Sequence, residues 1–116
     1  MQKQYSRSSR ISDLLQREIA VMIQQDIKDP RLGKMVTVSA VEISRDLSFA
    51  KVYITQLDTE KESIQATLKI LNHAAGYIRS QLGQRVKLRL TPQLKFVYDE
   101  SISHGAYLSD LMKDFK

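Results

Sequence analysis

The 116-residue sequence contains no cysteine, and this absence excludes two kinds of site at once. Without cysteine, neither a disulfide framework nor a thiolate metal centre can form. A chain that needs no disulfide is typical of a reducing compartment, so we expect the protein to be cytoplasmic.

The sequence also has no long apolar run. No stretch approaches the roughly 18 to 20 apolar residues that a membrane span requires. The polar N-terminus lacks the apolar core of a signal peptide. We therefore expect no membrane partner and no export.

Residues with catalytic or metal-binding chemistry are scarce. The two histidines, His73 and His104, have no histidine or carboxylate at metal-ligand spacing. The sequence contains no nucleophile elbow, Walker A loop or dinucleotide-binding fingerprint. Its clustered carboxylates fall in expected loops and helix caps, where they stabilise turns and helix dipoles. We expect no metal, no cofactor and no catalysis.

Positive charge is what the chain has in excess. Its 18 lysines and arginines outnumber 13 aspartates and glutamates, which gives a net charge of +5 and a pI near 9.6. Residues 1–34 contain seven basic and four acidic residues, and residues 79–95 contain five basic residues and no acidic one. Nucleic acid is the commonest partner of such a domain. An acidic membrane surface or an acidic protein is the alternative that charge alone leaves open.

The chain has the size and composition of one globular domain. Hydrophobic residues make up 42% of it and charged residues 27%, and no repeat, low-complexity tract or long linker divides it. We expect a single domain over residues 1–116 with a frayed N-terminus (about 1–5) and a short C-terminal tail (about 101–116). Apolar residues from Tyr107 to Phe115 could form an amphipathic helix in that tail.

The first predicted helix runs from the serines at 6, 8 and 9 to about Ile27. At 100° per residue, Arg7, Arg10 and Arg17 fall within an arc of roughly 80° beside its apolar face. Such an arc is either a solvated flank or a phosphate-binding surface. Because the nearby carboxylates balance it only partly, phosphate contact is the favoured interpretation.

Two strands are predicted next. A strand from Met35 to Ser44 changes the phase of its apolar alternation, which indicates a bulge near Ala40. A short hairpin connection, which contains Arg45, leads to a return strand from Phe49 to Gln56.

A second helix is predicted from apolar residues spaced by three and four between Ile64 and Leu82. Thr59 and Glu62 stand in capping-box relation at its start, and Gly83 is the expected stop. The sequence Ala74-Ala75-Gly76 interrupts this periodic stretch, and an internal glycine costs about 1 kcal/mol relative to alanine. Either these small residues let another backbone approach closely, which is the favoured interpretation, or a kink presents backbone N–H groups to a phosphate.

The segment after this helix is basic and alternating. Arg85, Lys87 and Arg89 alternate with aliphatic residues, so an extended segment would place them on one side, with Arg79 and Lys95 as flanking cations. A solvated strand face and an anionic partner are equally good explanations. A last strand carries Leu94, Phe96 and Tyr98.

The predicted order of elements is α-β-β-α-(kink)-α-β. This order describes an α+β fold in which helices cover one face of a three-stranded sheet. An RNA-recognition motif is not indicated. The aromatic residues available on the strands do not form its glycine-aromatic pattern; they are Phe49, Tyr53, Phe96 and Tyr98.

Four segments in this order resemble bacterial ribosome-binding factor A over almost the whole chain. They are Arg7-x-x-Arg10-Ile11, Asp29-Pro30-Arg31, the hairpin from Val41 to Tyr53, and Arg89-x-x-Pro92-x-Leu94-x-Phe96-x-Tyr98-Asp99. The resemblance implies a type II KH domain in which an interhelical kink at an alanine-x-glycine element replaces the usual GxxG loop. Ala74, Ala75 and Gly76 match that element.

The resemblance also implies a function. The family binds the free 30S ribosomal subunit and assists late maturation of 16S rRNA, including processing of its 5′ end, without catalysis, and is linked to growth in the cold. A monomeric protein of this kind would pair its cations with RNA phosphates. The expected RNA-binding residues are Arg7, Arg10, Arg17, Arg45, Arg79, Arg85, Lys87 and Arg89.

The competing hypothesis is a protein-interaction module. In this hypothesis the second helix and the C-terminal helix form a partner groove, and the charge serves only steering and solubility. A third hypothesis, an enzyme acting on RNA, requires that the purified protein alone cleave or modify RNA.

Overall fold

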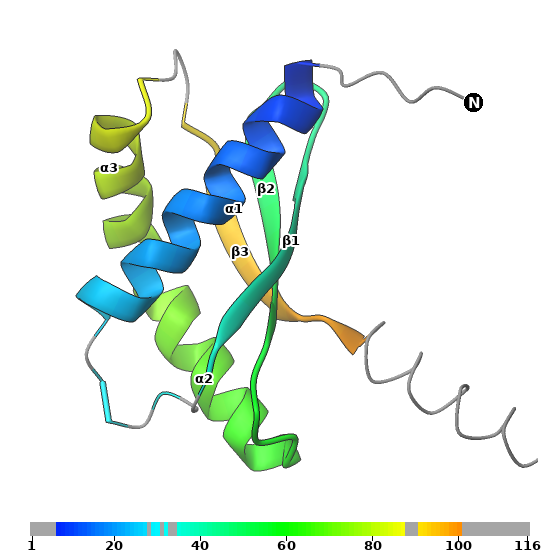
Figure 1. The fold of residues 1–116 in the computed structure, drawn as a ribbon, viewed down its shortest axis with the longest axis vertical. Helices are drawn as coiled ribbons and strands as arrows, with labels where there is room; N and C mark the ends of the chain where they lie inside the picture. The colour runs from blue at the N-terminus through cyan, green and yellow to red at the C-terminus, as the bar shows by residue number, and fades with distance from the viewer. Residues whose placement is uncertain (1–6, 28, 31, 33–34, 88–90, 101–116) are drawn as a thin grey trace, which may run out of the picture.

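The described part of the chain in the computed structural model (Figure 1) contains three helices and three strands in the order α-β-β-α-α-β. The structure describes residues 7–27, 29–30, 32, 35–87 and 91–100. The predicted frayed N-terminus, the C-terminal tail with its predicted helix, and Arg89 lie outside these residues.

Helix α1 spans Arg7–Asp26. It begins among the serines predicted as N-caps and ends one residue before the predicted end near Ile27. Its inner face consists of Leu15, Ile19 and Met22, which are fully buried. Burial of such aliphatic side chains contributes roughly 1.5–3 kcal/mol each. Gln16 on the same helix donates from Nε2 to the carbonyl oxygens of Val38 and Ser39, at 3.1 and 3.2 Å, and so fastens α1 to the sheet.

The sheet consists of β1 (Thr37–Ile43), β2 (Phe49–Thr55) and β3 (Gln93–Tyr98), in the order β1-β2-β3. The β1–β2 pair is antiparallel and the β2–β3 pair is parallel. The register shifts between Val38 and Ala40 on β1, which confirms the predicted bulge. Strand β3 is an edge strand, because it pairs only with β2 in the described sheet.

The helices cover one face of the sheet, as the sequence predicted (Figure 1). On β2, Ala50, Val52 and Ile54 are fully buried, and on β3 Phe96 is buried beside them. The alternate residues of these strands include Lys51 and are exposed or half-buried. Period-two alternation along the strands therefore fixes the face that forms the core.

Two helices follow the sheet's first hairpin. Helix α2 (Lys61–His73) and helix α3 (Ala75–Arg85) are separated only by Ala74, which lies outside helical geometry at φ −88° and ψ 1°. The interruption predicted at 74–76 is therefore present. Leu71, Ile78 and Leu82 are fully buried and carry the apolar stripe across the break.

The predicted capping box at the start of α2 is wrong. Glu60, not Thr59, is the N-cap residue, and no side chain bonds to the free N–H groups of the first turn. Asp58 Oδ1 instead accepts a hydrogen bond from the Glu60 N–H at 3.0 Å. An aspartate side chain can accept a hydrogen bond from the backbone N–H two residues later, in an Asx turn. At the start of α2 this turn takes the place of the predicted capping box.

The predicted helix stop at Gly83 is also wrong, because α3 continues to Arg85. A Cβ at Gly83 would lie 3.0 Å from Thr91 Oγ1, so glycine permits close approach between α3 and the chain leading into β3. Arg85 is consequently the last helical residue and not part of an extended segment, and Val86 is the first extended residue.

Candidate nucleic-acid interface

The cations of α1 lie on its exposed side. Arg10 and Arg17 are both exposed and are seven residues apart, which is close to two helical turns. They therefore project from the same side of α1. Arg7 is the first residue of the helix, but its side chain is not among the described parts of the structure. Its phosphate contact therefore stays a prediction.

Arg85 joins α3 to α1 through two ion pairs. Its Nη1 lies 3.4 Å from Glu18 Oε1 and its Nη2 lies 3.8 Å from Asp26 Oδ2. At the last turn of α3 a guanidinium also interacts favourably with the helix dipole. The two ion pairs therefore fix the position of the Arg85 side chain. An RNA phosphate that binds Arg85 must compete with the carboxylates of Glu18 and Asp26.

Arg79 also has an internal partner. Its Nε and Nη2 donate to the carbonyl oxygen of Thr91 at 3.1 and 3.0 Å, which ties α3 to the segment before β3. A guanidinium has five N–H donors, so this pair of bonds leaves capacity for an external acceptor.

The remaining predicted cations stand on connections between elements. Lys87 is exposed two residues after α3, and Arg45 is exposed in the β1–β2 hairpin. The hairpin contacts the start of β3, where the Gln93 N–H donates to the Ser48 carbonyl at 3.0 Å. The structure thus brings the cations of α1 and α3 into one helical layer and leaves Arg45 on a separate element.

The interhelical kink keeps its hydrogen bonding while it changes direction. The Ala74 N–H donates to the Ile70 carbonyl at 3.0 Å, and the Ala74 carbonyl accepts from the Ile78 N–H at 2.9 Å. The interpretation that small residues permit close approach predicts packing at this site, and Ala74 and Ala75 are half-buried against the core.

That interpretation is wrong for Gly76. No atom of the described residues lies within 4 Å of the position that a Cβ would take there, and its φ is not positive. Neither internal packing nor backbone conformation therefore requires glycine at this exposed position. The free space beside Gly76 is open to a partner from outside the chain.

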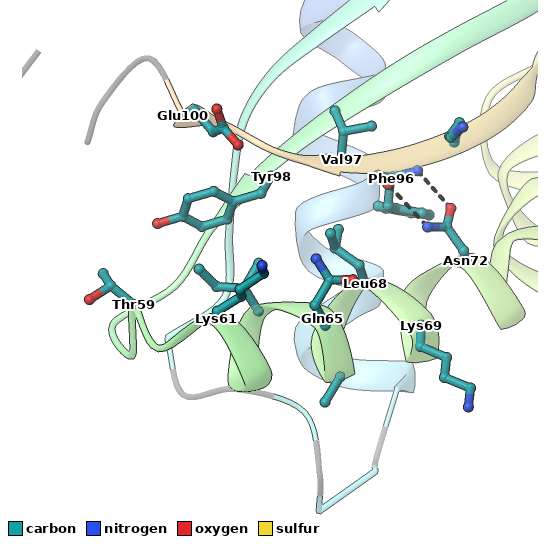
Figure 2. Close-up of a pocket in the computed structure, with 13 residues that line it drawn as sticks. Thr59, Lys61, Gln65, Leu68, Lys69, Asn72, Phe96, Val97, Tyr98 and Glu100 are labelled. Atoms are coloured by element: carbon teal, nitrogen blue, oxygen red, sulfur yellow. Dashed lines mark hydrogen bonds between the residues drawn. The ribbon is translucent and has the colours of Figure 1, made fainter. Parts of the chain in front are cut away.

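Sequence reasoning missed a groove of about 930 Å³ between α2 and the edge strand β3. Figure 2 shows that Phe96 and Tyr98 point from β3 toward α2, whereas Val97 points the other way. Lysines 61, 69 and 95 also line this groove. Its walls are apolar and its cations sit on both sides, a combination suited to a nucleotide chain.

Asn72 closes part of this groove against β3. Its Nδ2 donates to the Phe96 carbonyl at 3.0 Å, and its Oδ1 accepts from the Phe96 N–H at 2.8 Å (Figure 2). The sequence shows only that Asn72 lies on the flank of an amphipathic helix. No sequence pattern predicts that it bonds to Phe96, which lies 24 positions later.

The described ranges hold no group of three or more histidine, aspartate or glutamate residues placed to bind a metal. In the same ranges, no helix has the length and apolarity needed to cross a bilayer. His73 is exposed on α2, and His104 lies outside the described part of the chain.

The order α-β-β-α-α-β, the parallel β2–β3 pair and the kink between α2 and α3 define a type II KH-like domain with a basic helical layer. A family model described as ribosome-binding factor A matches residues 7–112. The chain belongs to the ribosome-binding factor A family.

Individual relatives agree with this assignment. Ribosome-binding factor A proteins of Stutzerimonas stutzeri and Ectopseudomonas mendocina are 53% and 56% identical over 115 residues, covering 97% of this chain and 88% of each relative. The crystal structure of ribosome-binding factor A from Thermus thermophilus matches with a TM-score of 0.66 at 32% identity, covering 81% of this chain and 97% of that one.

A second structural match concerns a complex of the same Thermus thermophilus factor. It is a homology model of the Thermus thermophilus factor fitted into a cryo-EM map of a 30S–RbfA complex. It matches with a TM-score of 0.62 at 32% identity and covers 77% of this chain and 91% of that one.

Proposed function

We propose that this protein binds the free 30S ribosomal subunit and assists late maturation of 16S rRNA. The observation that carries the proposal is the relative of the same fold that was fitted into a map of a 30S complex. The net charge of +5 and the exposed cations of α1 support an RNA partner, because phosphate contacts dominate the affinity of nucleic-acid binding.

The proposed contacts use the cations on the helical layer and its connections. Within the described part of the chain Arg10 and Arg17 are exposed and form no ion pair, whereas Arg79 and Arg85 already serve the fold. The full proposed set is Arg7, Arg10, Arg17, Arg45, Arg79, Arg85, Lys87 and Arg89. The free space at Gly76 makes the kink element at residues 74–76 a further place for RNA to approach.

The proposed mechanism is a shift of conformational population and not catalysis. A protein that binds one arrangement of the subunit RNA more tightly than another favours that arrangement by the difference in binding free energy. Correct positioning of the RNA then allows processing enzymes to mature its 5′ end. Activated rearrangements slow on cooling, so the assistance matters most in the cold. The protein acts as a monomer in the cytoplasm, where subunits assemble.

The test is partition of the purified protein among free small subunits, free large subunits and joined ribosomes, measured by co-sedimentation. We expect binding to free small subunits alone and no cleavage of purified 16S rRNA precursor by the protein. Absence of binding to small subunits would refute the proposal. Equal binding to all three particles would show only general affinity for RNA.

A further inference from the structure

The face of the sheet opposite the helices carries an ordered set of side chains that the proposed function does not use. On the central strand β2, Phe49, Lys51 and Tyr53 alternate with fully buried residues. No described element covers these three side chains. Phe49 is 44% exposed, which is unusual for phenylalanine in a domain with a formed core.

The structure divides the four aromatic residues of the strands into two pairs on opposite faces of the sheet. Phe96 and Tyr98 on β3 point toward α2 (Figure 2), whereas Phe49 and Tyr53 lie on the open face. The Tyr53 hydroxyl donates to Glu42 Oε1 at 3.0 Å, and this bond raises the pKa of the tyrosine. The bond also restricts the orientation of the ring, so less conformational entropy is lost when a ligand packs on it.

The same face brings two cations together on neighbouring strands. Lys51 and Lys95 are direct neighbours in the β2–β3 register, and like charges at such positions destabilise a sheet. Among described residues neither lysine forms an ion pair. Glu42 on β1 is the register partner of Lys51 and also accepts the hydrogen bond of Tyr53, so this carboxylate stands beside only one of the two lysines.

We propose that this open sheet face is a second RNA-binding surface, and that its ligand is single-stranded RNA. Bases stack on Phe49 and Tyr53, and the RNA backbone neutralises the Lys51–Lys95 pair. Aromatic platforms interleaved with cations bind single strands because every base has a π-face and every nucleotide a phosphate. A protein partner fits less well, since the Lys51–Lys95 pair separates Phe49 from the Tyr53–Val97 pair and leaves no continuous apolar patch among the described residues.

This inference rests on the proposed function and extends it. The helical layer and the open face lie on opposite sides of the sheet, so one domain can contact folded RNA with its helices and a single strand with its sheet. The open face also differs from the α2–β3 groove. Lys95 stands on the edge strand and borders both surfaces, whereas Phe49 and Lys51 do not line the groove.

The experiment measures fluorescence anisotropy of a labelled oligouridylate of about eight nucleotides, within the range of single-strand site sizes. The first variant is Phe49→Ala, with Leu57→Ala as the control that removes an exposed aliphatic side chain beyond the end of β2. We expect Phe49→Ala to weaken binding about fivefold or more, which is the effect of losing one stacked base. Leu57→Ala should leave affinity unchanged.

The second pair of variants tests the cations. Lys51→Gln/Lys95→Gln should make the slope of log affinity against log salt shallower by about 1.4, the value for two single-strand phosphates. Lys61→Gln/Lys69→Gln removes the same charge from the α2 side of the groove and should change the slope less. Urea denaturation of each variant establishes that the fold is retained.

Three outcomes overturn the proposal. Phe49→Ala and Leu57→Ala could bind the oligonucleotide equally, or the Lys61/Lys69 pair could lose as much affinity as the Lys51/Lys95 pair, which would place the strand in the groove. The full chain could also fail to bind the oligonucleotide at all. Binding to small subunits that persists in any of these cases leaves the proposed function standing.

Discussion

Asn72 on helix α2 pairs with the backbone of Phe96 on the edge strand β3 through two hydrogen bonds, of 3.0 and 2.8 Å. The side-chain amide thus takes the place that a neighbouring strand would occupy at this residue. An unpaired edge is a template for strand addition, and covering it is one way in which sheets avoid association. The same pair fixes the separation of the two walls of the α2–β3 groove.

Replacing Asn72 by alanine should lower the free energy of unfolding by about 1 to 2 kcal/mol, because the Phe96 N–H and carbonyl lose their partner. Urea denaturation measures this change. Gln65→Ala, at an exposed position of the same helix, is the control and should have little effect. Equal stability of the two variants would show that water replaces Asn72 without cost.

The two glycines of α3 should respond in opposite ways to alanine. Gly76→Ala should raise the free energy of unfolding by about 0.5–1 kcal/mol, since its Cβ enters open space in a helix. Gly83→Ala should bring no such gain, because its Cβ meets Thr91 Oγ1 at 3.0 Å. Thr91→Ala in the same chain should restore the gain at Gly83. A loss of stability in Gly76→Ala would contradict the described environment of the kink.

Freeing Arg85 should strengthen RNA binding. The double change Glu18→Gln/Asp26→Asn removes both carboxylates that pair with its guanidinium. Affinity for small subunits should rise about twofold to fivefold beyond the control, since an exposed ion pair is worth roughly 0.2–1 kcal/mol. Glu60→Gln/Glu62→Gln removes the same charge at the start of α2 and is the matched control. An identical rise in both variants would mean that only net charge matters.

The β1–β2 hairpin should lose stability in acid. Asp46 Oδ1 accepts hydrogen bonds from the Ser44 and Ser48 hydroxyls and from the Ser48 N–H, and these bonds hold the pKa of Asp46 below its ordinary 3.8. A carboxyl with a lowered pKa stabilises the fold above its unfolded value, and this contribution is lost as pH falls through the folded value. An NMR titration of the Asp46 carboxyl should give a midpoint below 3.8. A midpoint at or above that value would contradict the described turn.

The elements that the sequence predicts correctly depend on local periodicity. Helix α1 and strand β2 have apolar residues at periods of 3.6 and 2, and burial follows those periods in the structure. The bulge near Ala40 is visible for the same reason, because it shifts the phase of the alternation.

The wrong predictions fall where a distant part of the chain decides the local structure. Gly83 lies inside α3, where the lack of a side chain permits the close approach of Thr91 from another segment. The alternating pattern places Arg85 on an extended basic face, but the partners that hold it in α3 stand on α1, more than fifty positions earlier. Residue type gives the charge of a side chain, but not the internal groups that already bind it.

Salt dependence of binding to free small subunits tests the central claim, that exposed cations bind RNA phosphates. For contact with about five phosphates, log affinity should fall against log salt with a slope of roughly −3.5 to −4.5. Arg10→Gln/Arg17→Gln removes two phosphate contacts and should make that slope shallower by roughly 1.4 to 1.8. An affinity that barely changes with salt, and does not respond to loss of these arginines, would contradict the account and favour a protein-interaction module.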